Sequence, residues 1–493
     1  MKKTYILFVC LLASITNCPA QSWQKVGTGI NALNLTGTGN AICADVHNNI
    51  YVGGWTLDDS GGQSVYKWDG TSWNELGHGP SSLAPAGGQI EAVFADATGN
   101  IYASAYDASA GGYYVAKWDG TRWSPLGTGY PVASNISSIT ADRHGNLYAA
   151  GGFHDALFKY YVVKWDGTNW SEVGTGSNSL GAIAPIYCIV ADTFDNIYVA
   201  GAFSNNANDT SAELYVAKWN GTNWSEVGTG VALTYYHGET IYALQEDVSG
   251  NLYAAGSFTN SRHKYYVAKW DGTTWSELGN GTNALNANGM IHSMCFDKKG
   301  NMYAAGFFTD TTANLSNPTL NATTGLVTSR DTIHPYYVAK WDGTTWGNTG
   351  MAANALNANK GIFSICPDAN GNIYSVGVFT DTTVVIPYES HLPHSRTEYL
   401  YPFYVAKYNA GTSAVAPLAS DDNVFIYPNP TNSKLTITTH NKIDNVEIYD
   451  ITARTVFSRQ YNMPKVNVNV SSLPPGTYFV RVNGVLIQKF IKE

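Results

Sequence analysis

Two segments decide the fold: Asp142-Arg143-His144-Gly145-Asn146-Leu147-Tyr148 and Lys164-Trp165-Asp166-Gly167-Thr168-Asn169-Trp170. The first follows the pattern Asp, two residues, Gly-Asn, an aliphatic residue or Met, and Tyr. It has seven copies, two of them variants, at residues 45–51, 96–102, 142–148, 192–198, 247–253, 297–303 and 368–374. The second, Lys-Trp-Asp/Asn-Gly-Thr-x-Trp, recurs at 67–73, 117–123, 164–170, 218–224, 269–275 and 340–346, with a degenerate copy at 407–412. A fixed period of about 50 residues is typical of a repeat architecture.

Each repeat unit contains four short runs suited to β-strands, separated by turn residues. In the second unit these runs are 90–95, 100–105, 113–118 and 121–126. The third turn is Asp-Gly, a strong signal for a two-residue hairpin. Four strands in each of seven units predict an all-β, seven-bladed β-propeller over residues 21–412.

The recurring Asp and Trp residues have a functional alternative: seven metal sites and a row of sugar platforms. No Asp-x-Asp-x-Asp-Gly calcium loop occurs, and a residue repeated at every turn is more simply a turn former. A two-residue turn places Trp118 and Trp123 on one face of their hairpin, where they can fill the outer part of the wedge between blades. We therefore interpret both motifs as structural and expect neither a metal nor a cofactor.

The two ends of the repeat region complement each other. Residues 22–29 match fourth-strand segments such as 222–228, although no first three strands precede them. The last unit lacks its fourth strand after Tyr408. We predict that the N-terminal strand completes the seventh blade and closes the ring, which leaves no unpaired edge at the seam.

The N-terminus has the charged, apolar and small-residue regions of a signal peptide, which we assign to residues 1–20. A lipidated Cys18 is the alternative. No later apolar run is long enough to span a membrane. The formal net charge of −9, without any dense basic run, argues against nucleic acid as a partner.

Removal of the signal peptide would leave four cysteines, Cys43, Cys188, Cys295 and Cys366. We place them at one phase of the repeat, where residues of different units should not meet as a disulfide requires. We interpret them as buried free thiols rather than as catalytic or metal-binding residues.

A different β pattern follows a linker at 413–422 and occupies residues 423–493. Its motif residues are Tyr427, Pro428, Asn429 and Pro430 at the opening, Pro475, Gly476 and Tyr478 in a late strand, and Lys489, Phe490 and Lys492 near the end. The segment resembles the type A C-terminal sorting domain of the type IX secretion system, and the propeller units resemble the Trp-Asp-Gly-rich and kelch-like repeats of secreted proteins. An ordinary accessory β-sandwich is the alternative for the C-terminal segment.

The sorting-domain resemblance implies an immunoglobulin-like sandwich, a translocon and a sorting peptidase as partners, and export to the outer-membrane surface of a Gram-negative bacterium. It also implies that the sorting domain is cut off, with the cargo released or attached to surface lipopolysaccharide.

No common catalytic motif is present, such as His-Glu-x-x-His, Gly-x-Ser-x-Gly or a P-loop. Propeller enzymes draw their catalytic residues from separate blades, so the candidates are Glu91, Glu239 and His292, near the starts of innermost strands. Residues of this kind are more often simply polar side chains at the mouth of a central channel, which is the alternative interpretation.

The connections between second and third strands are more informative. From the Tyr of the second strand to the Lys of the third they span 15 to 20 positions in units one to five, but 37 and 33 in units six and seven. Long loops on a rigid scaffold commonly carry binding residues. We expect both inserts at one end of the ring, beside Glu91, Glu239 and His292. We assign ligand contacts to the insert residues Tyr388, His391, His394, Arg396 and Tyr399, together with Glu91, Glu239 and His292. A metal held by Glu389, His391 and His394 is the alternative to a solvated loop.

These observations favour a secreted or cell-surface binding protein, either an adhesin or a carbohydrate-binding propeller, with a glycan or surface protein as ligand. An extracellular polysaccharide hydrolase or lyase is the second hypothesis, and a structural surface component is the third.

Overall fold

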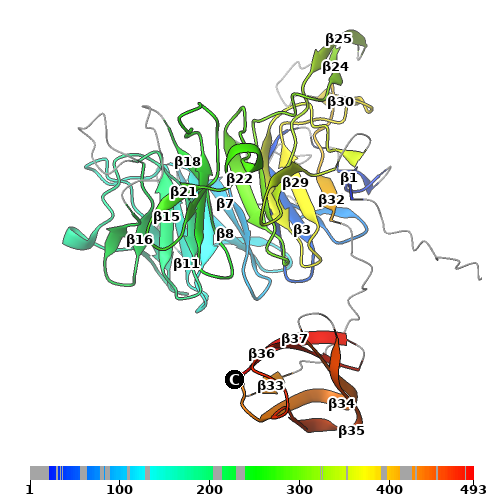
Figure 1. The fold of residues 1–493 in the computed structure, drawn as a ribbon. Coiled ribbons are helices and arrows are strands. Elements are labelled where there is room, and N and C mark those ends of the chain that lie inside the picture. Colours follow the sequence, from blue (N-terminus) through cyan, green and yellow to red (C-terminus); the bar gives the residue numbers. More distant parts are fainter. Residues whose placement is uncertain are drawn as a thin grey trace, which may run out of the picture. The chain divides into compact units, whose positions relative to one another are not determined.

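The computed structural model describes residues 21–493 except 29–30, 34, 36, 56–63, 78–82, 84–88, 108–110, 128–133, 204–213, 229–238, 323, 325, 351–353, 390–396, 411–424, 428–429, 451–453 and 484. Residues 19–411 form one compact unit, and the chain from Thr412 to Glu493 belongs to a second (Figure 1). The predicted signal peptide and linker lie outside the described residues. Among the described residues, no helix is long and apolar enough to cross a membrane.

Seven four-stranded antiparallel sheets, counted over the described residues, make up the first unit. We call them blades one to seven. Blades one to three consist of β2 (Gly39–Ala44), β3 (Ile50–Gly54), β4 (Tyr66–Trp68) and β5 (Trp73–Glu75); β6 (Val93–Ala95), β7 (Ile101–Asp107), β8 (Gly112–Trp118) and β9 (Trp123–Pro125); and β10 (Ile136–Ala141), β11 (Leu147–Gly151), β12 (Val163–Trp165) and β13 (Trp170–Glu172).

Blades four to seven continue the same order. They consist of β14 (Ile186–Ala191), β15 (Ile197–Gly201), β16 (Ala217–Trp219) and β17 (Trp224–Glu226); β18 (Ile241–Glu246), β19 (Leu252–Gly256), β20 (Ala268–Trp270) and β21 (Trp275–Glu277); β22 (Ile291–Phe296), β23 (Met302–Gly306), β26 (Ala339–Trp341) and β27 (Trp346–Asn348); and β28 (Ile362–Pro367), β29 (Ile373–Gly377), β32 (Ala406–Asn409) and β1 (Ser22–Lys25). Two short 3-10 helices, η3 (Gly176–Asn178) and η4 (Gly281–Asn283), follow blades three and five.

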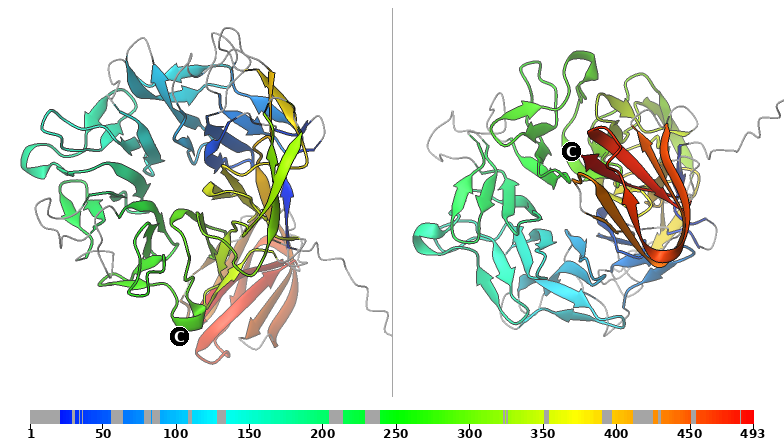
Figure 2. Two further views of the ribbon diagram at one scale, coloured as in Figure 1. Left: turned by 90° about the horizontal axis from the view of Figure 1, so that it is seen from above. Right: turned by 60° about the horizontal axis from the view of Figure 1, so that its bottom comes forward.

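The first strand of each blade lies innermost, and these inner strands contact one another in sequence around a ring. The order is β2, β6, β10, β14, β18, β22 and β28, and β28 returns to contact β2. Figure 2 shows the blades arranged in a ring when the propeller is seen from above. The predicted β-propeller is confirmed.

The N-terminal strand completes blade seven, as predicted. β1 pairs antiparallel with β32, with Trp23 opposite Tyr408. The Trp23 indole N–H donates to the Thr349 carbonyl oxygen at 3.0 Å, and Lys25 forms a 3.0 Å ion pair with Asp381. The seam is therefore closed by main-chain pairing of β1 with β32 and by side-chain contacts of β1 with blade six and with the connection between β29 and β32.

Each fourth-strand Trp joins its blade to the preceding one. Its indole N–H donates to a carbonyl oxygen at the end of the previous blade's fourth strand, as Trp224 does to Val173 at 2.9 Å. The same bond joins Trp73 to Val26, Trp123 to Leu76, Trp170 to Leu126, Trp275 to Val227, Trp346 to Leu278 and Trp23 to Thr349. The prediction that these residues pack between blades is confirmed.

The recurring Asp is a turn former, as predicted. In blade one, Asp45 Oδ1 accepts the main-chain N–H groups of His47 and Asn49, while Oδ2 accepts the Tyr51 hydroxyl at 2.9 Å. The Lys67 ammonium lies over the Tyr51 ring, 5.8 Å from its centroid. The Asp–Tyr bond and the Lys–Tyr contact recur in all seven blades.

Both long inserts form β-hairpins, where the sequence predicted only loops. β24 (Leu315–Leu320) pairs with β25 (Val327–Ile333) in the sixth-blade insert, and β30 (Ile386–Glu389) pairs with β31 (Thr397–Leu400) in the seventh. The hairpins project from the same end of the ring (Figure 1). The Asn359 amide nitrogen donates to Asn317 on β24 at 3.1 Å, which ties the first hairpin to the segment that leads into blade seven.

The four cysteines are free thiols, as predicted, but they do not share one phase of the repeat. Cys43, Cys295 and Cys366 are the fifth residues of their inner strands, whereas Cys188 is the third. Burial raises the pKa of all four thiols, which keeps them protonated.

The described residues of the second unit form one five-stranded sheet. It contains β33 (Phe425–Tyr427), β34 (Lys434–Asp450), β35 (Thr455–Asn469), β36 (Gly476–Val482) and β37 (Val485–Lys492). Of the predicted sorting motif, Tyr478 and Phe490 stack in the core with ring centroids 5.5 Å apart, Tyr427 is exposed, and Pro428 and Asn429 lie outside the described residues. One hydrogen-bonded sheet does not confirm the two-sheet immunoglobulin-like sandwich.

Candidate functional site

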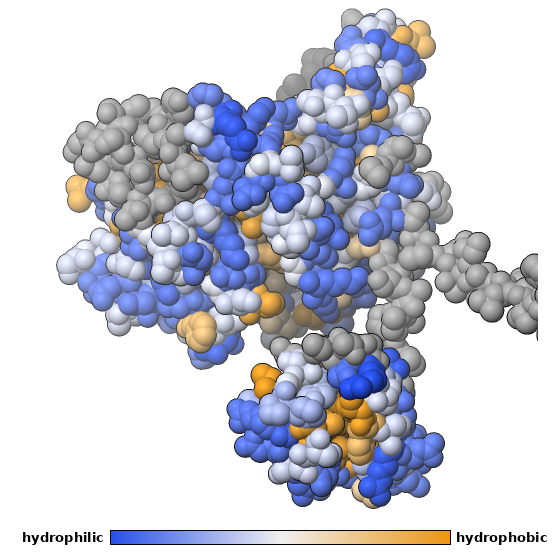
Figure 3. All heavy atoms as spheres, viewed as in Figure 1, coloured by the Kyte–Doolittle hydropathy of each residue, from blue (hydrophilic) through white to orange (hydrophobic). Residues whose placement is uncertain are grey.

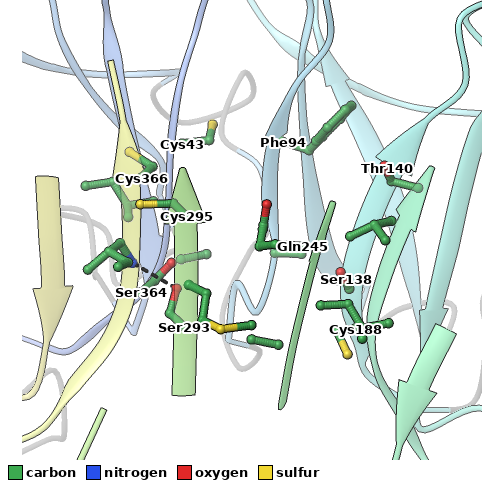
Figure 4. A pocket seen from close by; sticks show the side chains of 18 of the residues that line it. Cys43, Phe94, Ser138, Thr140, Cys188, Gln245, Ser293, Cys295, Ser364 and Cys366 are labelled. Atoms are coloured by element: carbon green, nitrogen blue, oxygen red, sulfur yellow. Dashed lines mark hydrogen bonds between the residues drawn. The ribbon is translucent and has the colours of Figure 1, made fainter. Parts of the chain in front are cut away.

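The central channel encloses a cavity of about 670 Å³, lined by residues from all seven inner strands or the residues just before them (Figure 4). Short polar side chains join neighbouring walls of the channel: Ser293 Oγ accepts the Ile365 N–H at 3.1 Å, and Ser138 Oγ accepts the Ile189 N–H at 3.4 Å. A rigid, preformed cavity of this size is the usual form of a ligand site.

One residue of each blade forms a ring at the mouth of the channel, which we call the mouth ring. Each member directly follows the first residue of its inner strand, or the equivalent buried Ile90 in blade two. The members are Asn40, Glu91, Ser137, Tyr187, Tyr242, His292 and Phe363.

A recurring backbone irregularity positions the mouth ring. In six blades the strand register shifts at this residue, as between Ile186 and Cys188, so that Tyr187 has no partner in the ladder. Such a bulge turns a side chain away from the regular alternation of the strand. In blade two, Ser104 Oγ takes the place of a ladder partner and accepts the N–H groups of Glu91 and Ala92, both at 3.0 Å.

The mouth ring lies at the insert-bearing end of the propeller. Ile291, which precedes His292, pairs with Gly306, the last residue of β23. The sixth-blade insert leaves the blade after this same Gly306. The sequence predicted that the inserts lie beside the starts of the inner strands, and the structure places them there.

Four consecutive members form a continuous aromatic wall. Ring centroids are 5.5 Å apart for Tyr187 and Tyr242, 5.0 Å for Tyr242 and His292, and 5.5 Å for His292 and Phe363. Phe307, just after β23, extends the wall at 5.6 Å from Phe363. Rings in contact at these distances stabilise one another and hold a shared apolar surface.

His292 belongs to this wall as a neutral ring. Burial lowers its pKa below the ordinary value of 6.5, so the imidazole carries no charge at neutral pH. Its Nδ1 lies 2.9 Å from the Phe363 carbonyl oxygen, which can only accept a hydrogen bond. Nδ1 therefore carries the proton, and Nε2 is left as an acceptor.

The rest of the mouth ring is polar. Its members are Asn40 in blade one, Glu91 in blade two and Ser137 in blade three. Burial raises the pKa of the Glu91 carboxyl above its ordinary value of 4.5. Over the described residues, no side chain forms an ion pair or a hydrogen bond with this carboxylate. Asn40 is anchored by its amide nitrogen, which donates to Gln89 at 3.0 Å. The mouth thus has an apolar arc and a hydrogen-bonding arc.

The channel has an acidic character. Its described lining residues include Glu91 near one end and Glu246 near the other, but no Lys or Arg. Burial, with Asp192 and Asp247 nearby, raises the pKa of Glu246 to about 7. The channel therefore disfavours anionic ligands.

The structure brings two of the predicted site residues together, since Glu91 and His292 both belong to the mouth ring. Glu239 is buried just before β18 and does not line the channel. Tyr388 and Tyr399 lie on the paired strands β30 and β31, and His391, His394 and Arg396 lie outside the described residues.

Sequence reasoning missed Tyr187, Tyr242 and Phe363. The signal that could have found them is the residue after the apolar start of each first strand, compared across the units.

Three side chains of metal-ligating type gather at the end of the ring opposite the inserts, where ligand atoms of Asp142, His144 and Asp195 lie within 4.8 Å of one another. The Arg143 guanidinium already donates to both Asp195 oxygens, at 2.8 and 3.2 Å, and Asp142 is occupied by its turn. These interactions account for the cluster without an ion.

Residues 425–493 match the family described as the secretion system C-terminal sorting domain. This part of the chain is therefore a sorting domain, and it indicates a secreted or cell-surface location. No curated protein sequence matches the chain.

Three solved structures resemble the fold at low identity. PorZ, a surface component of the type IX secretion system of Porphyromonas gingivalis, is 15% identical with a TM-score of 0.46, and the match covers 92% of this chain and 59% of PorZ. The extracellular domain of a hybrid two-component system of B. thetaiotaomicron is 13% identical with a TM-score of 0.47, covering 90% of this chain and 47% of that one. The WD40 propeller domain of Doa1 is 11% identical with a TM-score of 0.46, covering 80% and 98%. The chain thus spans about three fifths of the length of PorZ and about half of the length of the two-component protein. None of the three similarities assigns an activity to this chain.

Proposed function

We propose that the chain is a secreted or cell-surface binding protein, an adhesin or carbohydrate-binding propeller, that holds its ligand at the insert-bearing end of the ring. The observation that carries the proposal is the mouth ring, in which an aromatic wall faces the partly buried Glu91 carboxylate across a preformed channel. Concave sites with an apolar lining and few polar groups are typical of ligand binding. Both inserted hairpins stand at this same end (Figure 1).

The two ends of the propeller differ in a way that supports this location. Asp-centred turns and Asp-Gly hairpins repeat at the opposite end and satisfy their own hydrogen bonds. Figure 3 shows the surface of the propeller in this view as largely hydrophilic, with only scattered apolar residues. The aromatic wall that lines the channel therefore differs from this outer surface, which favours a ligand in the channel.

The proposal includes the export and the processing of the chain. Residues 1–20 direct export to the periplasm, and residues 423–493 address the folded cargo to the translocon and its sorting peptidase. Cleavage in or near the 413–422 linker releases the propeller or leaves it attached to surface lipopolysaccharide.

A glycan array combined with a polysaccharide-degradation screen, both on the purified chain from residue 21, tests the proposed function. We expect binding to a subset of glycans, without release of new reducing ends or unsaturated sugars. Sustained degradation of a polysaccharide would replace the proposal with the hydrolase or lyase hypothesis.

A second experiment locates the ligand. The seventh-blade insert, residues 378–405, is replaced by the short blade-five connector, residues 257–267. We expect the chain to fold and its binding to fall strongly, because the hairpin stands beside the mouth. The location is wrong if binding survives this exchange but is lost when the Asp-Gly turns of the opposite end are altered.

A further inference from the structure

We infer that the mouth ring is a sugar subsite that takes one pyranose residue of an uncharged or amino-bearing glycan and excludes acidic sugars. The inference rests on the proposed function and adds the ligand class. It is carried by the division of the mouth into an aromatic arc and a hydrogen-bonding arc.

The aromatic arc matches the apolar face of a pyranose. Tyr187, Tyr242, His292 and Phe363 form an unbroken series of rings with centroids 5.0–5.5 Å apart. A pyranose presents C–H groups on its faces, and aromatic ring faces carry the partial negative charge that attracts them. Tyr242 and His292 stack on each other at an interplanar angle of 20°, so a sugar would meet the edges of these rings and the ring faces that no neighbour covers. Because the rings line one side of the mouth and do not enclose it, they do not form a cage for a quaternary ammonium ion.

The opposite arc matches the hydroxyl edge of the sugar. Glu91 offers carboxylate oxygens that accept hydrogen bonds, and Ser137 can donate or accept them. His292 contributes a further acceptor, Nε2, within the aromatic wall. Hydrogen bonds to a charged acceptor are among the stronger ones in binding sites.

The charge of the site sets the class of sugar. Glu91 and Glu246 are the acidic residues of the described channel lining, and no Lys or Arg balances them there. A uronic or sialic acid would bring its carboxylate into a low-dielectric channel that already holds Glu91, which is unfavourable. A neutral sugar meets no such penalty, and an amino sugar gains an ion pair.

Isothermal titration calorimetry on the chain from residue 21 tests the inference with three probes: neutral β-glucan oligosaccharides, glucosamine oligosaccharides and oligogalacturonate. We expect a neutral or amino probe to bind with a Kd of about 1 mM or tighter, and oligogalacturonate to bind at least about tenfold more weakly.

Two mouth-ring variants and one control make the test specific. Tyr242→Ala should weaken binding about tenfold or more by breaking the aromatic wall. Glu91→Gln keeps a hydrogen-bond acceptor but removes the negative charge. The variant should therefore reduce the difference in Kd between the neutral and the acidic probes. Phe194→Ala is the control. It removes an aromatic side chain that is 76% exposed beside the Asp192 turn, at the opposite end of the ring, and it should leave the Kd of every probe unchanged.

The outcomes separate the inference from the proposed function. Equal binding by wild type and folded Tyr242→Ala overturns the sugar subsite but leaves a binding protein with its site elsewhere. Stronger binding of oligogalacturonate than of the other probes overturns the charge argument. If no probe binds at about 10 mM while the chain still binds cell surfaces, the sugar subsite is wrong and the proposed function stands.

Discussion

Glu91 occupies a position that opposes its own ionisation. Its carboxyl lies in the channel wall, where burial raises its pKa, and no described side chain compensates its charge. A group of this kind lowers stability at neutral pH, and such costs are concentrated at functional sites. His292, on the other side of the mouth ring, avoids a similar cost because it stays neutral and donates a hydrogen bond to the Phe363 carbonyl oxygen.

Glu91→Gln should therefore stabilise the propeller at neutral pH. Because the pKa of Glu91 is higher in the folded state than its ordinary 4.5, the folded state binds the proton more tightly than the unfolded state. Proton binding by Glu91 therefore stabilises the folded state fully below pH 4.5. This stabilisation is lost as the pH rises through the raised pKa of the folded state. Thermal unfolding followed by circular dichroism should give a higher Tm for the variant at pH 7.5 and equal Tm values near pH 4. A lower Tm for the variant at pH 7.5 would contradict this account.

The fourth-strand Trp residues allow a residue-level test of how blades are joined. Trp224→Phe keeps the aromatic ring but leaves the Val173 carbonyl without its indole donor, which should cost about 1–3 kcal/mol of unfolding free energy. Trp219→Phe is the control, since the described structure gives the Trp219 indole no hydrogen bond. Chemical denaturation measures both. Equal losses for the two variants would mean that the Val173 bond contributes little.

At the scale of elements, the repeat in the sequence predicts the strands, the turns and the seam, because each is specified by local residues. Asp45 and its equivalents determine turns, and residues 22–25 carry the fourth-strand pattern that blade seven lacks. The mouth ring is different. The bulge that turns Tyr187 and Tyr242 into the channel depends on the register between two strands, and neither strand alone encodes it. Similarly, residues 315–320 pair with residues 327–333 to form a hairpin, although their composition is typical of a loop.

Deletion of residues 22–29 tests the seam. The deletion removes strand β1, the Trp23 bond to Thr349 and the Lys25–Asp381 ion pair, and it leaves β32 as an unpaired edge. The Tm should fall far more than after deletion of eight residues around the tip of the β24–β25 hairpin, 319–326. An unchanged Tm would contradict closure by the N-terminal strand.

At the scale of the whole molecule, the chain combines a propeller and a sorting domain with separate hydrophobic cores. Leu435, Val446, Val480 and Phe490 belong to a core built only from residues of the C-terminal unit. Each unit therefore has the burial it needs to fold independently. The sequence motifs were sufficient to predict the sorting domain, because Tyr478 and its neighbours form a specific pattern, but they did not predict the arrangement of its strands.

Removal of residues 423–493 should abolish delivery to the cell surface without weakening the propeller. Surface labelling of cells that express the full and truncated chains measures delivery. Calorimetry of the two purified proteins should show a propeller transition at nearly the same temperature. Surface delivery of the truncated chain would disprove the role of this segment in sorting.

The central claim is that the ligand binds at the insert-bearing mouth, and hydrogen–deuterium exchange with and without the best-binding glycan tests it most directly. The account predicts that the ligand slows exchange in peptides that contain the starts of β14, β18, β22 and β28, around Tyr187, Tyr242, His292 and Phe363, and in the inserted hairpins. Peptides that contain the Asp-centred turns at 192–196 and 247–251 should exchange at unchanged rates. Protection of those turns, with no change at the mouth ring, would contradict the account.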